Sequence, residues 1–283
     1  MSLKSTILAL LCLGLFGCAT PTTPQQLQTL LEQNPEVLTN AIEANPLLFM
    51  EALQRTQKKA SIEYAAREEQ LAQQQRAAEY TNPRQPVIAP GRAILGNPEA
   101  PITIVTYSDF QCPYCVRGAD TLHQLRAAYC GQLRIVFKHL PLSFHPHAET
   151  AARYFEAIAR QGSEPAYTFH DLIFANQAQL NEKGEAFLIK TAAQAGADMK
   201  RLKTDLDDPS LNAVVDADQE EAAAFGFNGT PAFLVNGISI VGAQPVEEFI
   251  KIIDRVSGGT IKPGSMPSSA GAAGSGEDES CVQ

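Results

Sequence analysis

Hydrophobic and polar positions divide the chain into an all-helical segment and a mixed α/β segment. Between residues 25 and 80, apolar residues gather early and are followed mostly by Gln, Glu, Lys, Arg and Ala. Two Asn-Pro steps, at residues 34–35 and 45–46, predict helix starts, because Asn is a favoured N-cap and Pro fits the first helical position. We therefore expect two short helices and then one long helix from about Pro46 to Ala78.

The front of this segment carries too many apolar residues for a solvated surface and too few for an independent core. They are Leu27, Leu30, Leu31, Val37, Leu38, Ile42, Leu47, Leu48, Phe49, Met50 and Leu53. Residues 25–80 are therefore predicted to form an oligomerisation arm whose part 25–55 buries against a second copy of the chain. Packing against the chain's own second domain is the alternative. From Thr56 onward the long helix is expected to be a solvated spacer.

The pattern changes after a Pro- and Gly-punctuated boundary at residues 81–101. The apolar run ITIVTYSDF that follows predicts a strand buried on both faces. A helix is predicted for Val116–Ala128, and LRIVFKHLPL predicts the next strand. Residues 148–224, rich in Ala, Leu, Phe, Glu and Gln, read as four or five helices.

The last part of the segment predicts a hairpin and a helix. Two short apolar runs are separated by Asn236-Gly237, a strong signal for a type I′ turn, and PVEEFIKIIDRV has an amphipathic pattern. Strands and helices in this order predict an α/β domain over residues 86–257. The tail 258–283 is rich in Gly, Ser and Pro and is expected to be disordered.

The first residues have the pattern of a secretion signal. An apolar run from Ile7 to Phe16 is about half the length of a membrane-spanning helix, so residues 1–17 are predicted to be a signal peptide. The stretch LFGC resembles a bacterial lipobox, which implies a lipid on Cys18 and a tether at 18–24. Ordinary secretion without lipid is the alternative. Ala19 after the cysteine is typical of sorting to the outer membrane, and disulfides persist outside the cytoplasm.

Composition adds little that is specific. The 283 residues are 45% hydrophobic and 19% charged, which allows a sizeable core. A net charge of -9 without a basic stripe argues against a nucleic-acid partner.

The stretch SDFQCPYCVRGAD, residues 108–120, contains a pair of cysteines that is the candidate functional site. A zinc site needs a second cysteine pair or two correctly spaced histidines, and neither His145 and His147 nor any other histidines have that spacing. A structural disulfide closing so short a loop would be a weak constraint. The redox reading is favoured, because a cysteine that follows a strand and opens a helix has a stabilised thiolate. Cys112 is then the nucleophile and Cys115, three residues on, the resolving thiol.

VTYSDFQCPYC, followed later by GTPAFLVNG, resembles the DsbA-like branch of the thioredoxin-fold oxidoreductases over residues 90–257. The resemblance implies a thioredoxin fold with a helical insertion at about 148–224 and no cofactor or metal. It also implies that the Thr230-Pro231 peptide bond is cis, faces the cysteine pair and presents backbone to a substrate peptide. Pro113 and Tyr114, between the cysteines, would tune the redox couple.

Two departures from the family matter. Relatives often carry a buried acid six residues before the first cysteine, where this chain has Thr106, so the proton moves by water or through another group. Asp109 is a nearer acid, but a loop or capping role suits it as well as proton transfer. The inner pair is Pro-Tyr rather than Pro-His, which predicts a less oxidising couple.

Cys130 lies too far along the helix from Cys115 to join the pair. It is a buried free thiol, or pairs with Cys281, or bonds another chain; the residues leave this open.

The sequence therefore predicts an exported thiol–disulfide oxidoreductase that forms or isomerises disulfides in envelope proteins. It would reside in the periplasmic space, anchored to the outer membrane, and form a homo-oligomer. Its partners would be client proteins with cysteines and a membrane redox protein, either a quinone-coupled oxidase or a membrane reductant. The alternatives are a non-enzymatic outer-membrane chaperone or scaffold and a dedicated disulfide reductase.

Overall fold

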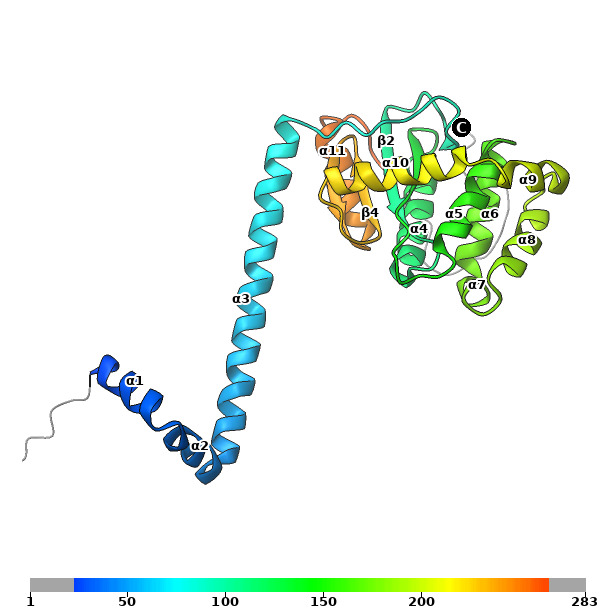
Figure 1. Cartoon of the computed structure of the whole chain (residues 1–283). Coiled ribbons are helices and arrows are strands. Elements are labelled where there is room, and N and C mark those ends of the chain that lie inside the picture. Colours follow the sequence, from blue (N-terminus) through cyan, green and yellow to red (C-terminus); the bar gives the residue numbers. More distant parts are fainter. Residues whose placement is uncertain (1–22, 265–283) are drawn as a thin grey trace, which may run out of the picture. The chain divides into compact units, whose positions relative to one another are not determined.

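The computed structural model describes residues 23–264, and the chain divides into two units, Met1–Leu71 and Ala72–Gln283. The predicted signal peptide, Cys18, Cys281 and the end of the tail lie outside the described residues. The first unit contains helices α1 (Pro24–Gln33) and α2 (Pro35–Ala44) and most of α3 (Pro46–Thr81), as Figure 1 shows. The two short helices and the long one occur as expected.

A capping box starts the first helix. The Thr23 hydroxyl accepts a hydrogen bond from the Gln26 N–H, and the Gln26 side chain accepts one from the Thr23 N–H. Asn34 is the N-cap of the next helix, as expected, but its side chain makes no capping hydrogen bond. The Asn34 side chain instead donates to the Leu30 carbonyl of the preceding helix, and Pro35 alone provides the favourable start of α2.

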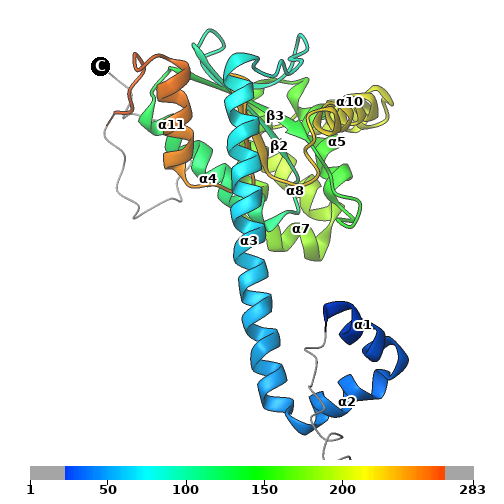
Figure 2. The ribbon, with the colours of Figure 1, turned by 90° about the vertical axis from the view of Figure 1, so that its left-hand side faces the viewer.

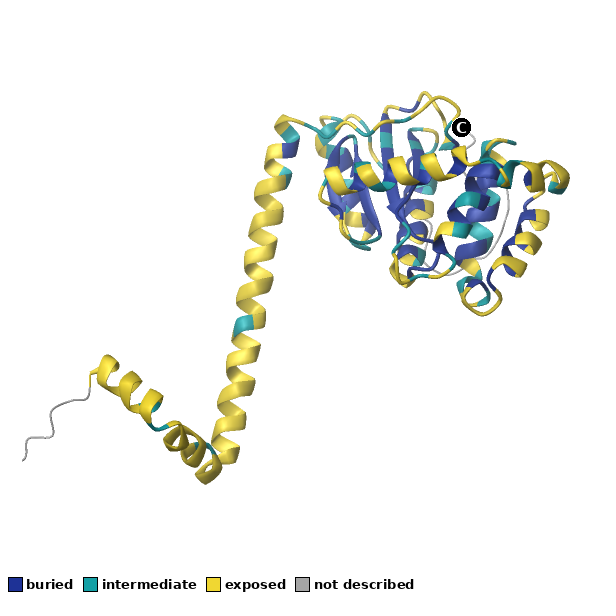
Figure 3. Cartoon of the chain, viewed as in Figure 1, coloured by how far each residue is buried: buried dark blue, intermediate teal, exposed yellow. Residues whose placement is uncertain are grey.

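The apolar residues of α1, α2 and the front of α3 are exposed. Neither α1 nor α2 contains a buried residue, and Leu47 and Leu48 are 80% and 61% exposed. In Figure 3 these helices are almost wholly yellow, the colour of exposed residues. Their apolar face has no covering group within the described residues.

The second unit is built on a five-stranded sheet in the order β1-β3-β2-β4-β5. The strands are β1 (Ile94–Gly96), β2 (Ile102–Ser108), β3 (Leu133–His139), β4 (Ala232–Val235) and β5 (Ile238–Val241). Strands β2 and β3 are parallel, and the other pairs are antiparallel. The short strand β1 lies in the segment that was predicted to be a domain boundary. The sequence pattern missed it because three residues among Pro and Gly are too few to show the alternation of a strand.

Helices cover both faces of this sheet. Ile102 and Ile104 of β2 pack in one cluster with residues of α4 (Pro113–Ala128) and α11 (Val246–Val256). Val105 and Tyr107, which point to the other face, pack in another cluster that includes Ala222 of α10 (Ser210–Ala224). Figure 2 shows α4 and α11 on one side and α10 on the other.

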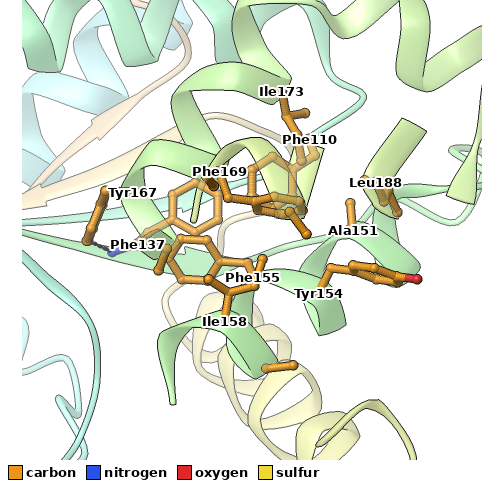
Figure 4. Close-up of a cluster of buried hydrophobic side chains, with 14 of the residues drawn as sticks. Phe110, Phe137, Ala151, Tyr154, Phe155, Ile158, Tyr167, Phe169, Ile173 and Leu188 are labelled. Carbon is orange, nitrogen blue, oxygen red and sulfur yellow. Dashed lines mark hydrogen bonds between the residues drawn. The ribbon is translucent and has the colours of Figure 1, made fainter. Parts of the chain in front are cut away.

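Six helices lie between β3 and β4, where four or five were expected. They are α5 (Ala148–Ala159), α6 (Ser163–Ala175), α7 (Gln177–Lys183), α8 (Glu185–Gln194), α9 (Met199–Leu206) and α10. The count was wrong because single residues separate some of them. Gly184 divides α7 from α8 with a φ of 53°, and a Cβ there would lie 2.7 Å from the His147 ring. Figure 4 shows the aromatic cluster that these helices form with Phe110 and Phe137.

The predicted hairpin between β4 and β5 is confirmed. Asn236 and Gly237 have φ values of 46° and 86°, as a type I′ turn requires. The end of α3 is joined to this hairpin, because the buried Glu79 carboxylate accepts hydrogen bonds from the Ser239 N–H and hydroxyl. Across residues 23–264, no helix combines the length and apolar character needed to cross a membrane.

Candidate active site

Cys112 lies at the junction between the central strand and the first helix of the sheet domain. It is the N-cap residue of α4, with Pro113 as the first helical residue. Its N–H donates to the Asp109 carbonyl at 3.1 Å, and its own carbonyl accepts from the Cys115 N–H at 3.0 Å. The Cys112 side chain therefore points from a helix N-terminus, where backbone N–H groups and the helix dipole favour an anion.

Cys115 lies one turn further into the helix and is more deeply buried. It is 1% exposed, against 4% for Cys112, and both are free thiols. The Asp109 N–H lies 3.5 Å from its sulfur. The two cysteines thus share one helix face, with Cys112 toward the rim and Cys115 beneath it.

The two thiols have opposite pKa shifts. A hydrogen bond from Cys115, with further ones from Thr230 and backbone N–H groups, lowers the pKa of Cys112 to about 5 against the effect of burial. Burial, and then the neighbouring Cys112, raise the pKa of Cys115 well above its ordinary value. At neutral pH the arrangement favours one thiolate on Cys112 and a thiol on Cys115.

Thr230 and Pro231 face the cysteine pair from the start of β4. The peptide bond between them is cis, and the Thr230 carbonyl oxygen lies 3.5 Å from the Cys112 sulfur. Gly118 of α4 makes this approach possible: an added Cβ would lie 3.1 Å from Cγ of Pro231 and 3.0 Å from Cζ of Phe233. Gly118 was not singled out from the sequence, although an isolated glycine inside a helical pattern is a sign of close packing.

The residues between the cysteines differ in exposure. Pro113 is exposed at the helix start, and Tyr114 is 56% exposed with the Arg117 guanidinium 4.9 Å from its ring centre. The Tyr114 ring therefore offers an aromatic surface beside Cys112, while its backbone N–H is one of the groups that lower the pKa of Cys112.

Asp109 holds the loop before Cys112. Its buried carboxylate accepts hydrogen bonds from the Gln111 and Leu142 N–H groups at 2.7 and 2.8 Å, and His145 Nδ1 lies 2.7 Å away. Of the two roles left open for Asp109, these contacts favour the loop role, because its oxygens are engaged by the loop itself.

Gln177 is a further site residue that sequence reasoning missed. Its side-chain amide donates to the carbonyls of Phe110 and Cys112, both at 2.9 Å. It connects helix α7 of the insertion to the cysteine loop. No local sequence signal marks it, because the two contacts span more than sixty residues.

Cys130 does not belong to this site. It takes part in a disulfide, so the free-thiol alternative is wrong, and the other cysteines of residues 23–264, Cys112 and Cys115, are not its partner. Within those same residues no group of three or more His, Cys, Asp or Glu could hold a metal ion.

Comparison with known proteins identifies the family. The family model described as thioredoxin matches residues 89–255. Among curated proteins, the chain is 35% identical over 167 residues to the Na⁺/H⁺ antiporter NhaA of Herminiimonas arsenicoxydans. That match covers 59% of this chain and 26% of the antiporter, so the chain spans about a quarter of the relative's length.

Solved structures show the same fold. A thioredoxin-like oxidoreductase from Silicibacter pomeroyi is 27% identical, with a TM-score of 0.52 over 60% of this chain and 94% of that one. A variant of alpha-DsbA1 from Wolbachia pipientis is 20% identical, with a TM-score of 0.54 over 61% of this chain and 93% of that one. With its sheet, its Cys-Pro-Tyr-Cys helix start and its cis-proline loop, the chain belongs to the thioredoxin family and has the DsbA-like form of its fold.

Proposed function

We propose that this chain is an exported thiol–disulfide oxidoreductase that forms and isomerises disulfides in proteins of the cell envelope. The observation that carries the proposal is the opposite shift of two adjacent thiols, with the pKa of Cys112 lowered to about 5 and that of Cys115 raised. A thiolate is the species that attacks disulfides, and a low thiol pKa also makes Cys112 a good leaving group.

The reaction proceeds through a covalent intermediate with the client. The Cys112 thiolate attacks a client disulfide, forms a mixed disulfide and releases one client thiolate. Cys115 then attacks Cys112, forms the Cys112–Cys115 disulfide and releases the second client thiol. In the oxidising direction the same steps run in reverse.

The surroundings of Cys112 suit an extended client segment. The cis-proline loop lies against the Cys112 sulfur. The exposed ring of Tyr114, next to Cys112, supplies apolar contact. Backbone pairing at Thr230–Pro231 with few specific pockets is consistent with many different clients.

The helical arm supports isomerisation in addition to oxidation. Its exposed apolar residues, such as Leu47 and Leu48, would bury against a second copy, bringing two cysteine pairs to one client. An isomerase must hold a misfolded client while it breaks and remakes bonds, which two sites do better than one. Pro113-Tyr114, without an imidazolium beside Cys112, would give a couple of moderate oxidising power.

Export and anchoring complete the proposal. Residues 1–17 have the pattern of a signal peptide, and Cys18 follows a lipobox-like stretch. The protein would act in the periplasmic space from the outer membrane and exchange electrons with a membrane redox protein. Labelling cells with a radioactive fatty acid tests the anchor: the wild-type chain should be labelled and Cys18→Ala unlabelled.

Oxidation of a peptide with two cysteines, in a glutathione buffer, tests the activity. The wild-type chain should accelerate disulfide formation, and Cys112→Ser should fall to the rate of the buffer alone. Thr121→Ala on the same helix is the matched control and should keep the wild-type rate. A chaperone or scaffold, by contrast, would suppress client aggregation equally well with Cys112→Ser and would not accelerate oxidation.

A further inference from the structure

His170 is a buried histidine behind the cysteine pair, and it has no role in the thiol–disulfide exchange described above. It lies on α6, is 5% exposed, and packs among the rings of Phe137 and Phe174 at centroid distances of 4.8 and 4.7 Å. An apolar side chain would fill this space without the cost of burying a polar ring. Its position therefore calls for an explanation other than packing.

Two small cavities that share lining residues lie beside His170. The first is lined by Cys115, Ser108, Thr106 and His170, and the second by Thr106, His170, Asp171 and His123. Thr106 and His170 belong to both. By the resemblance to the family, Thr106 occupies the position of a buried acid, and His170 lines the same cavity as Thr106 and Cys115.

The hydrogen bonds of His170 determine which nitrogen can take a proton. Nδ1 lies 2.7 Å from Oδ1 of Asp171. Although burial alone would raise it, hydrogen bonds from His123 and His170 hold the pKa of Asp171 below its usual value. Asp171 is therefore a carboxylate that accepts the Nδ1 proton, which leaves Nε2 of a neutral His170 as a base.

The path continues to solvent through half-exposed groups. Nε2 of His123 lies 3.2 Å from the same Asp171 oxygen, and the side chains of His123 and Asp171 are 43% and 40% exposed. A proton on His170 can thus pass outward by way of Asp171 and His123. The order Cys115, His170, Asp171, His123 runs from the buried thiol to the surface.

We propose that His170 exchanges the proton of Cys115 and so takes the place of the buried acid that Thr106 has replaced. This inference rests on the proposed function. When Cys115 attacks a mixed disulfide on Cys112, its sulfur forms the new S–S bond and the bond from Cys112 to the client breaks. The client leaves as a thiolate, and the Cys115 proton goes to His170. In the reverse reaction imidazolium returns the proton to the Cys115 thiolate.

Side chains carry the proton over the first part of this path. The cavity between Cys115 and His170 leaves no room for a water molecule, whereas the hydroxyls of Ser108 and Thr106 line it and can each accept one proton and donate another. The Ser108 side chain also lowers the pKa of Cys115, against the effects of burial and Cys112. The second cavity leaves about 10 Å³ for a water-sized molecule, near the lower limit for holding one.

The titratable groups that face His170 favour a neutral base that charges only transiently. They are Asp171 and Tyr167 from its own helix, His123 from α4 and His139 from β3, with Cys115 across the cavity. Burial lowers the pKa of His170 below its ordinary value, and Asp171 opposes this effect. Above about pH 6.5, the ordinary value, His170 is therefore ready to accept a proton.

The test is the pH profile of the second step. Reduced protein is mixed with oxidised glutathione, quenched with acid, and the decay of the Cys112–glutathione adduct is followed by mass spectrometry. The wild-type rate should change little between pH 6.5 and 8.5. His170→Asn keeps a donor for Asp171 but lacks the base; its rate should be about 100-fold lower at pH 6.5, rise about tenfold per pH unit, and reach the wild-type rate near pH 8.5.

One variant serves as a control, and a second substitution replaces His170→Asn if that variant does not fold. Thr121→Val removes a buried hydroxyl of α4 that lines neither cavity, and it should keep the wild-type profile. If His170→Asn does not fold, Asp171→Asn weakens the same base and should slow the step about threefold at pH 6.5 and not at 8.5.

The outcomes separate this inference from the proposed function. A His170→Asn profile equal to wild type, or a loss that is the same at every pH, overturns the role of His170 and leaves the oxidoreductase intact. If the wild-type protein forms no adduct with glutathione at all, the proposed function itself is wrong.

Discussion

The Cys112 sulfur lies 3.5 Å from the carbonyl oxygen of Thr230, at the point where a helix N-terminus meets a cis-proline loop. This contact brings together two segments that are far apart in the sequence, the start of the helix at Cys112 and the loop at Thr230-Pro231. It places the nucleophile beside the backbone that a client peptide would use.

Removing the Thr230 hydroxyl should make Cys112 less acidic. Thr230 is one of the groups that lower the pKa of Cys112, so Thr230→Val should raise that pKa from about 5 toward its ordinary value. The pH dependence of alkylation by iodoacetamide measures the change. Thr121→Val, whose hydroxyl bonds the Arg117 carbonyl on the same helix, is the control and should leave the midpoint unchanged.

The reduced protein should gain stability over the oxidised protein as pH rises. Cys112 has a folded-state pKa of about 5, below its unfolded value of about 8.5, so its ionisation stabilises the reduced fold above the unfolded pKa. That contribution is lost as pH falls through about 5, and the oxidised protein has no such thiol. Urea unfolding of both forms between pH 4 and pH 9 measures the difference, and a pH-independent gap would speak against the lowered pKa.

Gly118→Ala should damage both packing and activity. The new methyl group would lie 3.0 Å from Cζ of Phe233 and 3.1 Å from Cγ of Pro231, closer than ordinary contact. Overpacking costs about 1–3 kcal/mol and outweighs the gain of up to about 1 kcal/mol from alanine in a helix. Gly229→Ala has open space for its Cβ, and the comparison of the two variants in urea unfolding isolates the clash.

Polar substitutions in the front of the arm should dissociate the oligomer. Leu47→Gln with Leu48→Gln removes apolar area from the segment 25–55 that is proposed to bury against a second copy. Sedimentation should show fewer subunits, and reactivation of scrambled ribonuclease should fall while oxidation of a dithiol peptide is retained. Leu71→Gln, an exposed leucine in the spacer, is the matched control.

A deletion of the arm should end before the residues of α3 that contact the sheet domain. Removing residues up to 79 would take Glu79, which binds Ser239, and Arg76, which pairs with Glu248. A chain that starts at Ala72 keeps both contacts. Equal loss of oxidation and isomerisation in that chain would contradict a separate role for the arm.

Local patterns predicted much of the fold, because they record local physics. The strand at 102–108, the turn at Asn236–Gly237 and the helix starts at Pro35 and Pro46 follow from side-chain type and spacing alone. Strand β1 and the sixth helix of the insertion were missed. Their boundaries depend on pairing with β3 and on Gly184 packing against His147, which are tertiary contacts.

The candidate site was predicted in part for the same reason. The cysteine motif and the Thr230-Pro231 loop are short and local. Gln177 and His170 carry no local signal, since each reaches the cysteines only after the insertion folds over the sheet. The replacement of an acid by Thr106 was the one hint that another ionisable group should lie near Cys115.

The most direct test of the central claim is the mass of the Cys115→Ser variant after incubation with a disulfide-bonded peptide. We expect a stable adduct of one peptide half on Cys112, formed at a rate that falls as the pH is lowered, because the attacking thiolate is then protonated. A variant that stays unmodified while its Cys112 still reacts with iodoacetamide would contradict thiol–disulfide exchange as the function of this site.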